Sequence, residues 1–317
     1  MFARHNELDH DHHGHSLSED LVHMERQVAD RRRALKWFAG AGTAALMAGC
    51  GGGSGSSDSV DVVTGSSSTA TPTPTATATP TPTSTPTPTA TATSTSSGAC
   101  VADPTETAGP YPGDGTNTTS GSTSNVLISS GIVRSDIRPS FLTTSTVATG
   151  VEVTITLTVV NVNATCAPLS GYAVYLWHCD RNGKYSLYSG AANESYLRGV
   201  QVTDANGQVT FTTIFPACYD GRWPHMHFEV FSSLSSATGG RYAVLTSQFA
   251  MPAALCNAVY ADTTTYPASA TGFARVSLSN DNVFGDNTAA QIAQQTPTFS
   301  GSPSAGYTAT ALIGIAR

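Results

Sequence analysis

The chain has 317 residues, a formal net charge of −7 at pH 7 and only 12% charged residues. This acidic balance argues against nucleic acid or an anionic membrane surface as the main partner, because both select a basic face. The hydrophobic content of 39% permits a globular core, although its distribution along the chain is uneven.

The first fifty residues are predicted to be an export signal behind a histidine-rich leader. The arginine run at 31–33 precedes a short apolar stretch that ends in a small-residue step into Cys50. The stretch is too short for a stable membrane span. Arg31 and Arg32 resemble a twin-arginine (Tat) signal, and Ala48-Gly49-Cys50 resembles a bacterial lipoprotein cleavage site. We therefore expect a bacterial protein that is exported to the periplasm or cell surface and anchored through a lipidated Cys50.

Residues 51–99 have the composition of a disordered linker. They consist mainly of Gly, Ser, Thr, Pro and Ala, and they include TPTPTATATPTPTSTPTPTATATS. Such a segment cannot bury enough apolar surface to fold, so we expect an extended tether. Residues 100–317 remain, which is enough for one domain with its own core.

Short strands separated by turns are predicted throughout 100–317. Residues 151–159, VEVTITLTV, alternate between apolar and polar and predict a half-buried strand, whereas 171–177, GYAVYLW, predicts a central one. Further strands are expected at 208–215, 225–231, 241–249 and 307–315, with a short helix at 252–262. The pattern predicts an all-β fold, an antiparallel β-sandwich with long connecting loops and few short helices.

Five cysteines lie in this predicted domain: Cys100, Cys166, Cys179, Cys218 and Cys256. In an exported protein they are expected to form one or two disulfides and leave one thiol over, with the pairing open. The absence of any CxxC pair makes a zinc site a weak interpretation.

Two of the three histidines beyond residue 30 lie in the segment GRWPHMHFEV, residues 221–230. On a strand, alternate side chains share a face, so His225 and His227 point the same way together with Glu229. They could bind one metal ion, or they could be structural histidines with ordinary hydrogen bonds. The third, His178, is expected to be structural.

Two tyrosines near these histidines favour one particular metal. Tyr219 precedes the segment, and Tyr185 follows a predicted central strand. Ferric iron is a hard Lewis acid that can lower the pKa of a phenol, and two phenolates with two neutral imidazoles would form an N₂O₂ ligand set. Copper and zinc fit less well, because they typically recruit a third histidine or a thiolate.

Three stretches together resemble the intradiol ring-cleavage dioxygenases, which include the catechol 1,2- and protocatechuate 3,4-dioxygenases and their exported single-chain relatives. They are TETAGPYPGDG, WHCDRNGKYS and SYLRGVQVTDANGQVTFTTIFPACYDGRWPHMHFEV. The resemblance spans roughly Cys100 to the C-terminus. It implies Fe(3+) held by Tyr185, Tyr219, His225 and His227.

The resemblance also implies an activity. A catechol-like aromatic diol and O₂ would react so that both oxygen atoms enter between the two hydroxyl-bearing carbons, giving a muconate-type diacid. Tyr219 would accept a substrate proton, and Arg222 would stabilise negative charge on the ring, unless Arg222 forms only a structural hydrogen bond or a surface salt bridge. Tyr111 either contacts substrate or packs in a turn. The alternative function is a non-catalytic exported β-sandwich that binds polyphenols or carbohydrates.

Overall fold

The computed structural model describes residues 100–219 and 221–317. The predicted export signal, Cys50 and the linker at 51–99 lie outside these residues, so export, lipid attachment and the tether remain predictions. Among the described residues, no helix has both the length and the apolar character needed to cross a membrane.

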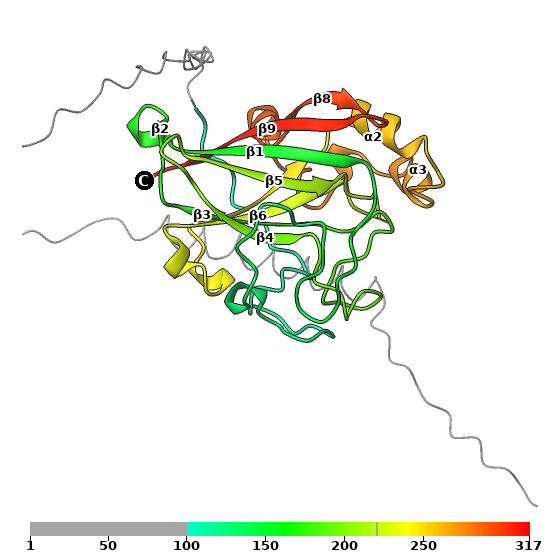
Figure 1. The fold of residues 1–317 in the computed structure, drawn as a ribbon. Coiled ribbons are helices and arrows are strands. Elements are labelled where there is room, and N and C mark those ends of the chain that lie inside the picture. The colour runs from blue at the N-terminus through cyan, green and yellow to red at the C-terminus, as the bar shows by residue number, and fades with distance from the viewer. Residues whose placement is uncertain (1–99, 220) are drawn as a thin grey trace, which may run out of the picture. The chain divides into compact units, whose positions relative to one another are not determined.

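Two β-sheets pack face to face, as Figure 1 shows. One sheet contains β1 (Glu152–Asn161), β2 (Ala167–Pro168), β5 (Gln208–Ile214), β8 (Thr298–Ser302) and β9 (Gly306–Ile315). The other contains, in spatial order, β4 (Arg198–Val202), β3 (Ala173–Trp177), β6 (His225–Phe231) and β7 (Leu245–Ala250). The helices are short: α2 (Ala253–Tyr260), α3 (Ser269–Phe273), α4 (Ala289–Gln294) and the single 3₁₀ turns η1 (Val126–Ile128), η2 (Val162–Ala164), η3 (Leu234–Ser236), η4 (Gly240–Tyr242) and η5 (Leu278–Asn280). The prediction of an all-β sandwich is confirmed.

One strand pair departs from the antiparallel expectation. β1 and β9 run parallel, with Val153 opposite Tyr307 and Asn161 opposite Ile315. A parallel pair requires a long connection between its strands, and the intervening chain, including the helical stretch from α2 to α4, supplies one. The period of two along β1 predicted its buried face but carried no information about strand direction.

The core lies between the two sheets. On β1, the alternate residues Val153, Ile155, Leu157 and Val159 are fully buried, as the sequence pattern predicted. On β6, Met226, Phe228 and Val230 are also fully buried. Each such side chain contributes about 1.5–3 kcal/mol through burial.

The other face of the four-stranded sheet is covered by the N-terminal part of the domain. Cross-strand partners on one row of this sheet are Arg198, Trp177, His227 and Gln248. Directly opposed residues project to the same face. The amide of Gln248 donates to the Thr107 carbonyl at 2.8 Å. The candidate site therefore lies between the sheet and this covering segment.

A single disulfide and three buried thiols are present among the described residues. The disulfide joins Cys100 to Cys166, and it ties the start of the domain to the β1–β2 connection. Cys179, Cys218 and Cys256 are free and buried. One disulfide agrees with the prediction, but the expectation of a single leftover thiol is wrong.

Several elements were not predicted from the sequence. The strands β4 and β8 and the helices α3 and α4 were not expected, and residues 240–242 form a 3₁₀ turn, η4, rather than the start of a strand.

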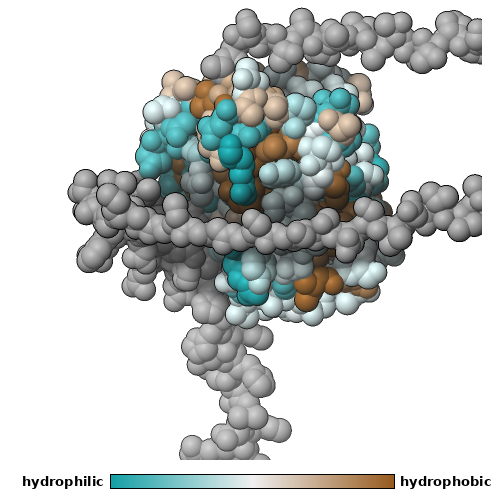
Figure 2. All heavy atoms as spheres, turned by 90° about the vertical axis from the view of Figure 1, so that its left-hand side faces the viewer, coloured by the Kyte–Doolittle hydropathy of each residue, from teal (hydrophilic) through white to brown (hydrophobic). Residues whose placement is uncertain are grey.

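On the face drawn in Figure 2, separate hydrophobic patches lie among hydrophilic residues. Scattered exposed apolar residues of this kind are usual on soluble proteins.

Candidate functional site

The four predicted metal ligands converge on one point. The Tyr185 Oη atom lies 3.2 Å from His225 Nε2 and 3.1 Å from His227 Nε2. The two Nε2 atoms are 3.1 Å apart, and Tyr219 Oη lies 3.3 Å from His225 Nε2. Tyr185 and both histidines are about 2% exposed. Two imidazole nitrogens and two phenol oxygens thus share a small buried volume.

Different elements deliver these side chains. The histidines alternate on β6, whereas Tyr185 follows a turn after β3 in which the Asp180 carboxylate accepts the backbone N–H groups of Asn182 and Lys184 at 2.8 and 2.9 Å. Gly183 in this turn has a φ of +75°, and a Cβ there would lie 3.0 Å from Tyr219 Cβ. Only glycine combines this left-handed backbone with so close an approach.

The hydrogen bond on the far side of each imidazole sets its tautomer. His225 Nδ1 lies 2.5 Å from the Trp223 carbonyl, which can only accept, so Nδ1 carries the proton and Nε2 presents a lone pair to the cluster. The ring of His227 stacks on Trp177 at 4.9 Å with a 9° interplanar angle. Its buried Nδ1 has no hydrogen-bond partner among the described residues.

This crowding fits a shared cation. Tyr185, Tyr219 and His227 all approach the one lone pair of His225 Nε2, which can accept one good hydrogen bond. A cation at their centre would satisfy the imidazole lone pairs and the phenol oxygens together. Within 100–219 and 221–317, no group of three or more His, Cys, Asp or Glu is placed to hold a metal ion. A cation held at this cluster would take the phenol oxygens of Tyr185 and Tyr219 together with the two imidazoles.

Burial keeps all four groups neutral in the metal-free protein. It raises the pKa of Tyr185 well above its usual value and that of Tyr219 to about 12, although the Arg222 charge moderates the second rise. It lowers the pKa of His225 to about 3 and that of His227 well below its usual value. The imidazoles are thus ready to act as ligands, whereas binding a cation through both phenols must release two protons.

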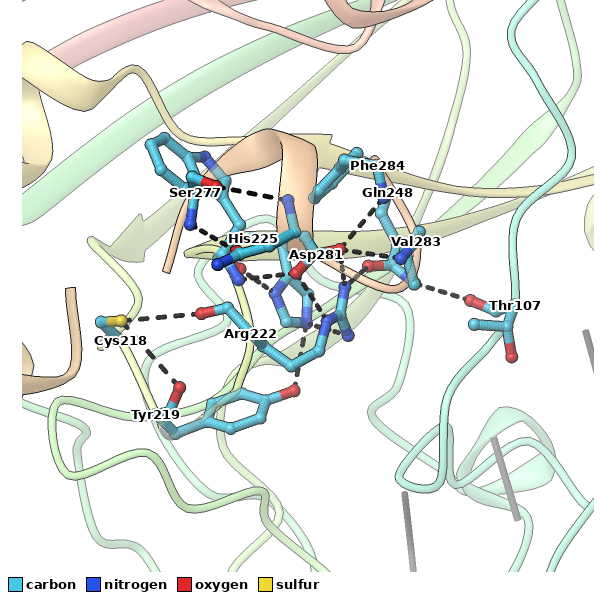
Figure 3. A network of polar contacts seen from close by, with 12 residues as sticks. Thr107, Cys218, Tyr219, Arg222, His225, Gln248, Ser277, Asp281, Val283 and Phe284 are labelled. Atoms are coloured by element: carbon cyan, nitrogen blue, oxygen red, sulfur yellow. Dashed lines mark hydrogen bonds and ion pairs between the residues drawn. The ribbon is translucent and has the colours of Figure 1, made fainter. Parts of the chain in front are cut away.

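Arg222 lies beside the cluster, and Figure 3 shows its polar contacts. Its NH1 is 3.4 Å from His225 Nε2, its NH2 donates to Gln248 Oε1 at 2.8 Å, and its Nε donates to Asp281 Oδ2 at 3.0 Å. The side chains of Arg222 and Asp281 are 1% and 0% exposed, so this is a buried ion pair rather than a surface one. The arrangement holds a positive charge next to the candidate metal position.

Tyr111 covers the cluster from the N-terminal segment. Its ring stacks on Tyr185 at 4.9 Å and meets the edge of Tyr188 at 5.1 Å. Nearby Gly109 has a φ of +72°, and a Cβ there would lie 3.2 Å from His227 Cε1. The segment TAGPYPGDG therefore packs directly against two of the predicted ligands, while substrate contact by Tyr111 remains a prediction.

Comparisons with known proteins bear on the fold and on the central segment of the chain. Residues 138–238 match a family model described as dioxygenase. The structure is similar to an intradiol ring-cleavage dioxygenase from Tetranychus urticae, with 24% identity over 68% of this chain and 95% of that chain and a TM-score of 0.51. It is also similar to the dioxygenase domain of a carbohydrate-binding fusion from Streptomyces sp. SirexAA-E, with 21% identity, coverage of 68% and 99%, and a TM-score of 0.41.

Residues 138–238 thus match a dioxygenase family model, and the fold resembles that of an intradiol ring-cleavage dioxygenase. The segment matched by the family model contains all four candidate ligands and Arg222. Tyr111 and Asp281 lie outside that segment; Tyr111 was a candidate from the sequence, whereas the position of Asp281 beside the site comes from the structure alone.

Two neighbours of the candidate site were missed from the sequence. Asp281, which lies 59 residues from Arg222, also accepts the backbone N–H of Trp223 at 2.7 Å. Gln248 on β7 stands opposite His227 and bridges Arg222 to the Thr107 carbonyl. The strand register would have revealed Gln248, whereas no local pattern marks Asp281.

His178 lies outside the cluster. Its Nδ1 is 2.8 Å from the Cys179 carbonyl, and its Nε2 is 2.6 Å from Thr213 Oγ1. Both ring nitrogens therefore have structural hydrogen bonds, which agrees with the interpretation from the sequence.

Proposed function

We propose that this protein is a non-haem Fe(III) intradiol dioxygenase that acts on a catechol-like aromatic diol. Both atoms of O₂ would enter between the hydroxyl-bearing carbons and give a muconate-type diacid. The observation that carries the proposal is the convergence of two phenol oxygens and two imidazole nitrogens, with successive contacts of 3.1–3.3 Å, in a buried site.

Tyr185, Tyr219, His225 and His227 would hold the ferric ion. Bound there, the ion would supply Lewis acidity that draws electron density from the diol and opens its ring to O₂. Carboxylate or thiolate ligands are not needed, because two phenolates provide two negative charges. The Trp223 carbonyl keeps the Nε2 lone pair of His225 directed at the ion.

Tyr219 would accept a proton from the incoming diol. Tyr219 is less buried as a residue than Tyr185, whose ring packs beneath Tyr111. The Tyr219 phenolate would be a strong base, because burial raises the pKa of the phenol to about 12. The protonated phenol would then remain beside Arg222.

Arg222 would stabilise negative charge that develops on the ring. Burial opposes its charge, but Asp281 raises the pKa of the guanidinium, so it stays protonated. A fixed charge in a dry site stabilises a transition state more strongly than a solvated one does. The ion pair with Asp281 holds the guanidinium beside His225.

The proposed location is the outside of the cytoplasmic membrane, with Cys50 as lipid anchor and 51–99 as tether. The signal-like residues before Cys50 support this proposal. The disulfide between Cys100 and Cys166 is also typical of an oxidising compartment.

The test is to load the purified protein with Fe(III) and record its visible spectrum. A tyrosinate-to-iron charge-transfer band should appear and should shift when catechol is added. A colourless, iron-free protein without O₂ uptake would refute the proposal and favour a non-catalytic binding module.

A further inference from the structure

Arg198, the first residue of β4, is a buried arginine beside the candidate site, and its side chain is 1% exposed. It donates five hydrogen bonds of 2.7–2.9 Å, all to uncharged oxygens: Ser186 Oγ, the Ser186 carbonyl, the Tyr111 carbonyl, the Pro112 carbonyl and Tyr175 Oη. A guanidinium has five N–H groups, so its donor capacity is fully used.

These bonds join two parts of the site that are far apart in the sequence. Ser186 follows the candidate ligand Tyr185, while the Tyr111 and Pro112 carbonyls belong to the segment that covers the cluster. Tyr175 adds a third connection, because its hydroxyl accepts from Arg198 and donates to the Pro112 carbonyl at 2.7 Å. The Arg198 side chain thus ties the backbone at Tyr111 to the backbone next to Tyr185, and so holds the two stacked rings together.

The backbone around this contact is strained. Leu187 and Leu197 have φ values of 71° and 55°, in the left-handed region that L-residues other than glycine rarely adopt. Each such residue costs about 1–3 kcal/mol and persists only where its surroundings hold it. The bonds between Arg198 and Ser186 link the residues that adjoin these two positions.

The covering segment is also packed at both ends. A Cβ at Gly113 would lie 3.1 Å from Arg198 NH1, just as one at Gly109 would lie 3.2 Å from His227 Cε1. Both glycines have positive φ. Tyr111 therefore sits between a contact with the Arg198 guanidinium and a contact with a candidate ligand.

We propose that Arg198 is a positioning residue that holds Tyr111 against Tyr185 and thereby sets the orientation of the Tyr185 phenol. The function of that phenol as a ligand rests on the proposed dioxygenase activity. Burying a guanidinium on neutral oxygens is costly, so its value lies in the geometry that five fixed donors impose. Lysine keeps the charge but offers three donors from a single atom and cannot reproduce this geometry.

Arg198→Lys and the matched control Arg134→Lys test the proposal. Arg134 also donates only to carbonyls, those of Ile137, Pro139, Ser195 and Arg198, and its guanidinium lies 4.2 Å from the Phe141 ring centroid. None of these bonds reaches Tyr111 or Ser186, and two of them hold the Arg198 carbonyl. Arg134→Lys thus controls for disturbance of the backbone at Arg198, whereas Arg198→Lys also breaks the side-chain bonds to Tyr111, Pro112, Tyr175 and Ser186.

The first readout is hydrogen exchange in the metal-free full chain. Losing one hydrogen bond to a charged group costs about 1.5–3 kcal/mol, so amides in 107–113 and 184–190 should exchange at least about tenfold faster in Arg198→Lys. In Arg134→Lys they should stay within about twofold of wild type. Equal exchange in both variants, or no change in either, would overturn the proposal. If Arg198→Lys does not fold, Ser186→Ala must loosen the same segments by a smaller factor, and unchanged exchange there would also overturn it.

The second readout is the spectrum after loading with Fe(III). The tyrosinate-to-iron band should shift in Arg198→Lys and keep its wild-type position in Arg134→Lys; an identical band in both would contradict control of Tyr185 by Arg198. A wild-type protein without any band would instead refute the proposed function. The exchange measurements would still decide whether Arg198 positions the two tyrosines.

Discussion

Replacing Asp281 with asparagine tests the buried ion pair that holds Arg222. The Asp281 carboxylate accepts from Arg222 and from the backbone N–H groups of Trp223, Val283 and Phe284, over 2.7–3.0 Å. Each carboxylate oxygen receives two of these four bonds. The substitution turns one carboxylate oxygen into an NH₂ group. The two N–H groups that donated to that oxygen then face a donor and lose their hydrogen bonds.

Removing one partner of a buried pair typically costs about 3–5 kcal/mol. We expect Asp281→Asn to lower the free energy of unfolding by this amount at pH 7, and the matched control, the exposed Asp286→Asn, to change it by less than about 1 kcal/mol. Urea unfolding of the metal-free protein measures both. A variant within about 1 kcal/mol of wild type would refute the reasoning.

The loss should also depend on pH. Burial by itself raises the pKa of Asp281, but the charge and hydrogen bonds of Arg222 outweigh it and lower the pKa below the usual 3.8. A lowered carboxyl pKa stabilises the folded state above the unfolded pKa, and this contribution disappears as the pH falls through the folded value. The gap between wild type and Asp281→Asn should therefore narrow below about pH 4.

Three further predictions concern the metal, a buried acid and the disulfide. Tyr219→Phe should retain iron through the other three ligands but change the charge-transfer band and slow turnover at least about tenfold; spectra and O₂ uptake like those of wild type would contradict its role. Burial raises the pKa of Asp103 from 3.8 to about 7, so folding should become less favourable by up to about 4 kcal/mol between pH 4 and 7. Asp103→Asn should remove this loss of stability with rising pH from thermal melts. An unchanged pH dependence of the melting temperature would contradict the raised pKa of Asp103. The paired replacement Cys100→Ser and Cys166→Ser opens a loop with a sequence separation of 66, so it should cost up to about 4 kcal/mol in urea unfolding; no loss would mean that the bond constrains little.

Local periodicity predicted the strands that carry the histidines and the core. The alternation along β1 and β6 is a property of each strand by itself, so His225 and His227 could be placed on one face before any strand partner was known. Strand direction could not be predicted from periodicity, because the parallel pairing of β1 with β9 depends on how the chain returns through α2–α4.

The candidate site was only partly accessible from the sequence. Tyr185 and Tyr219 lie on turns, whose course follows no simple period, and their relation to the histidines came from ligand chemistry and family resemblance. Asp281 and Arg198 act across long separations in the chain. Their contacts depend on the packing of loops on the sheet, which no short motif records.

The proposed activity is the insertion of both atoms of O₂ into an aromatic diol. The direct measurement is mass spectrometry of the product formed from catechol and ¹⁸O₂ by the iron-loaded protein. The proposed reaction predicts an acyclic diacid carrying label from O₂ in both new carboxyl groups, with one O₂ consumed for each diol. An unlabelled product, or a quinone without ring cleavage, would contradict it.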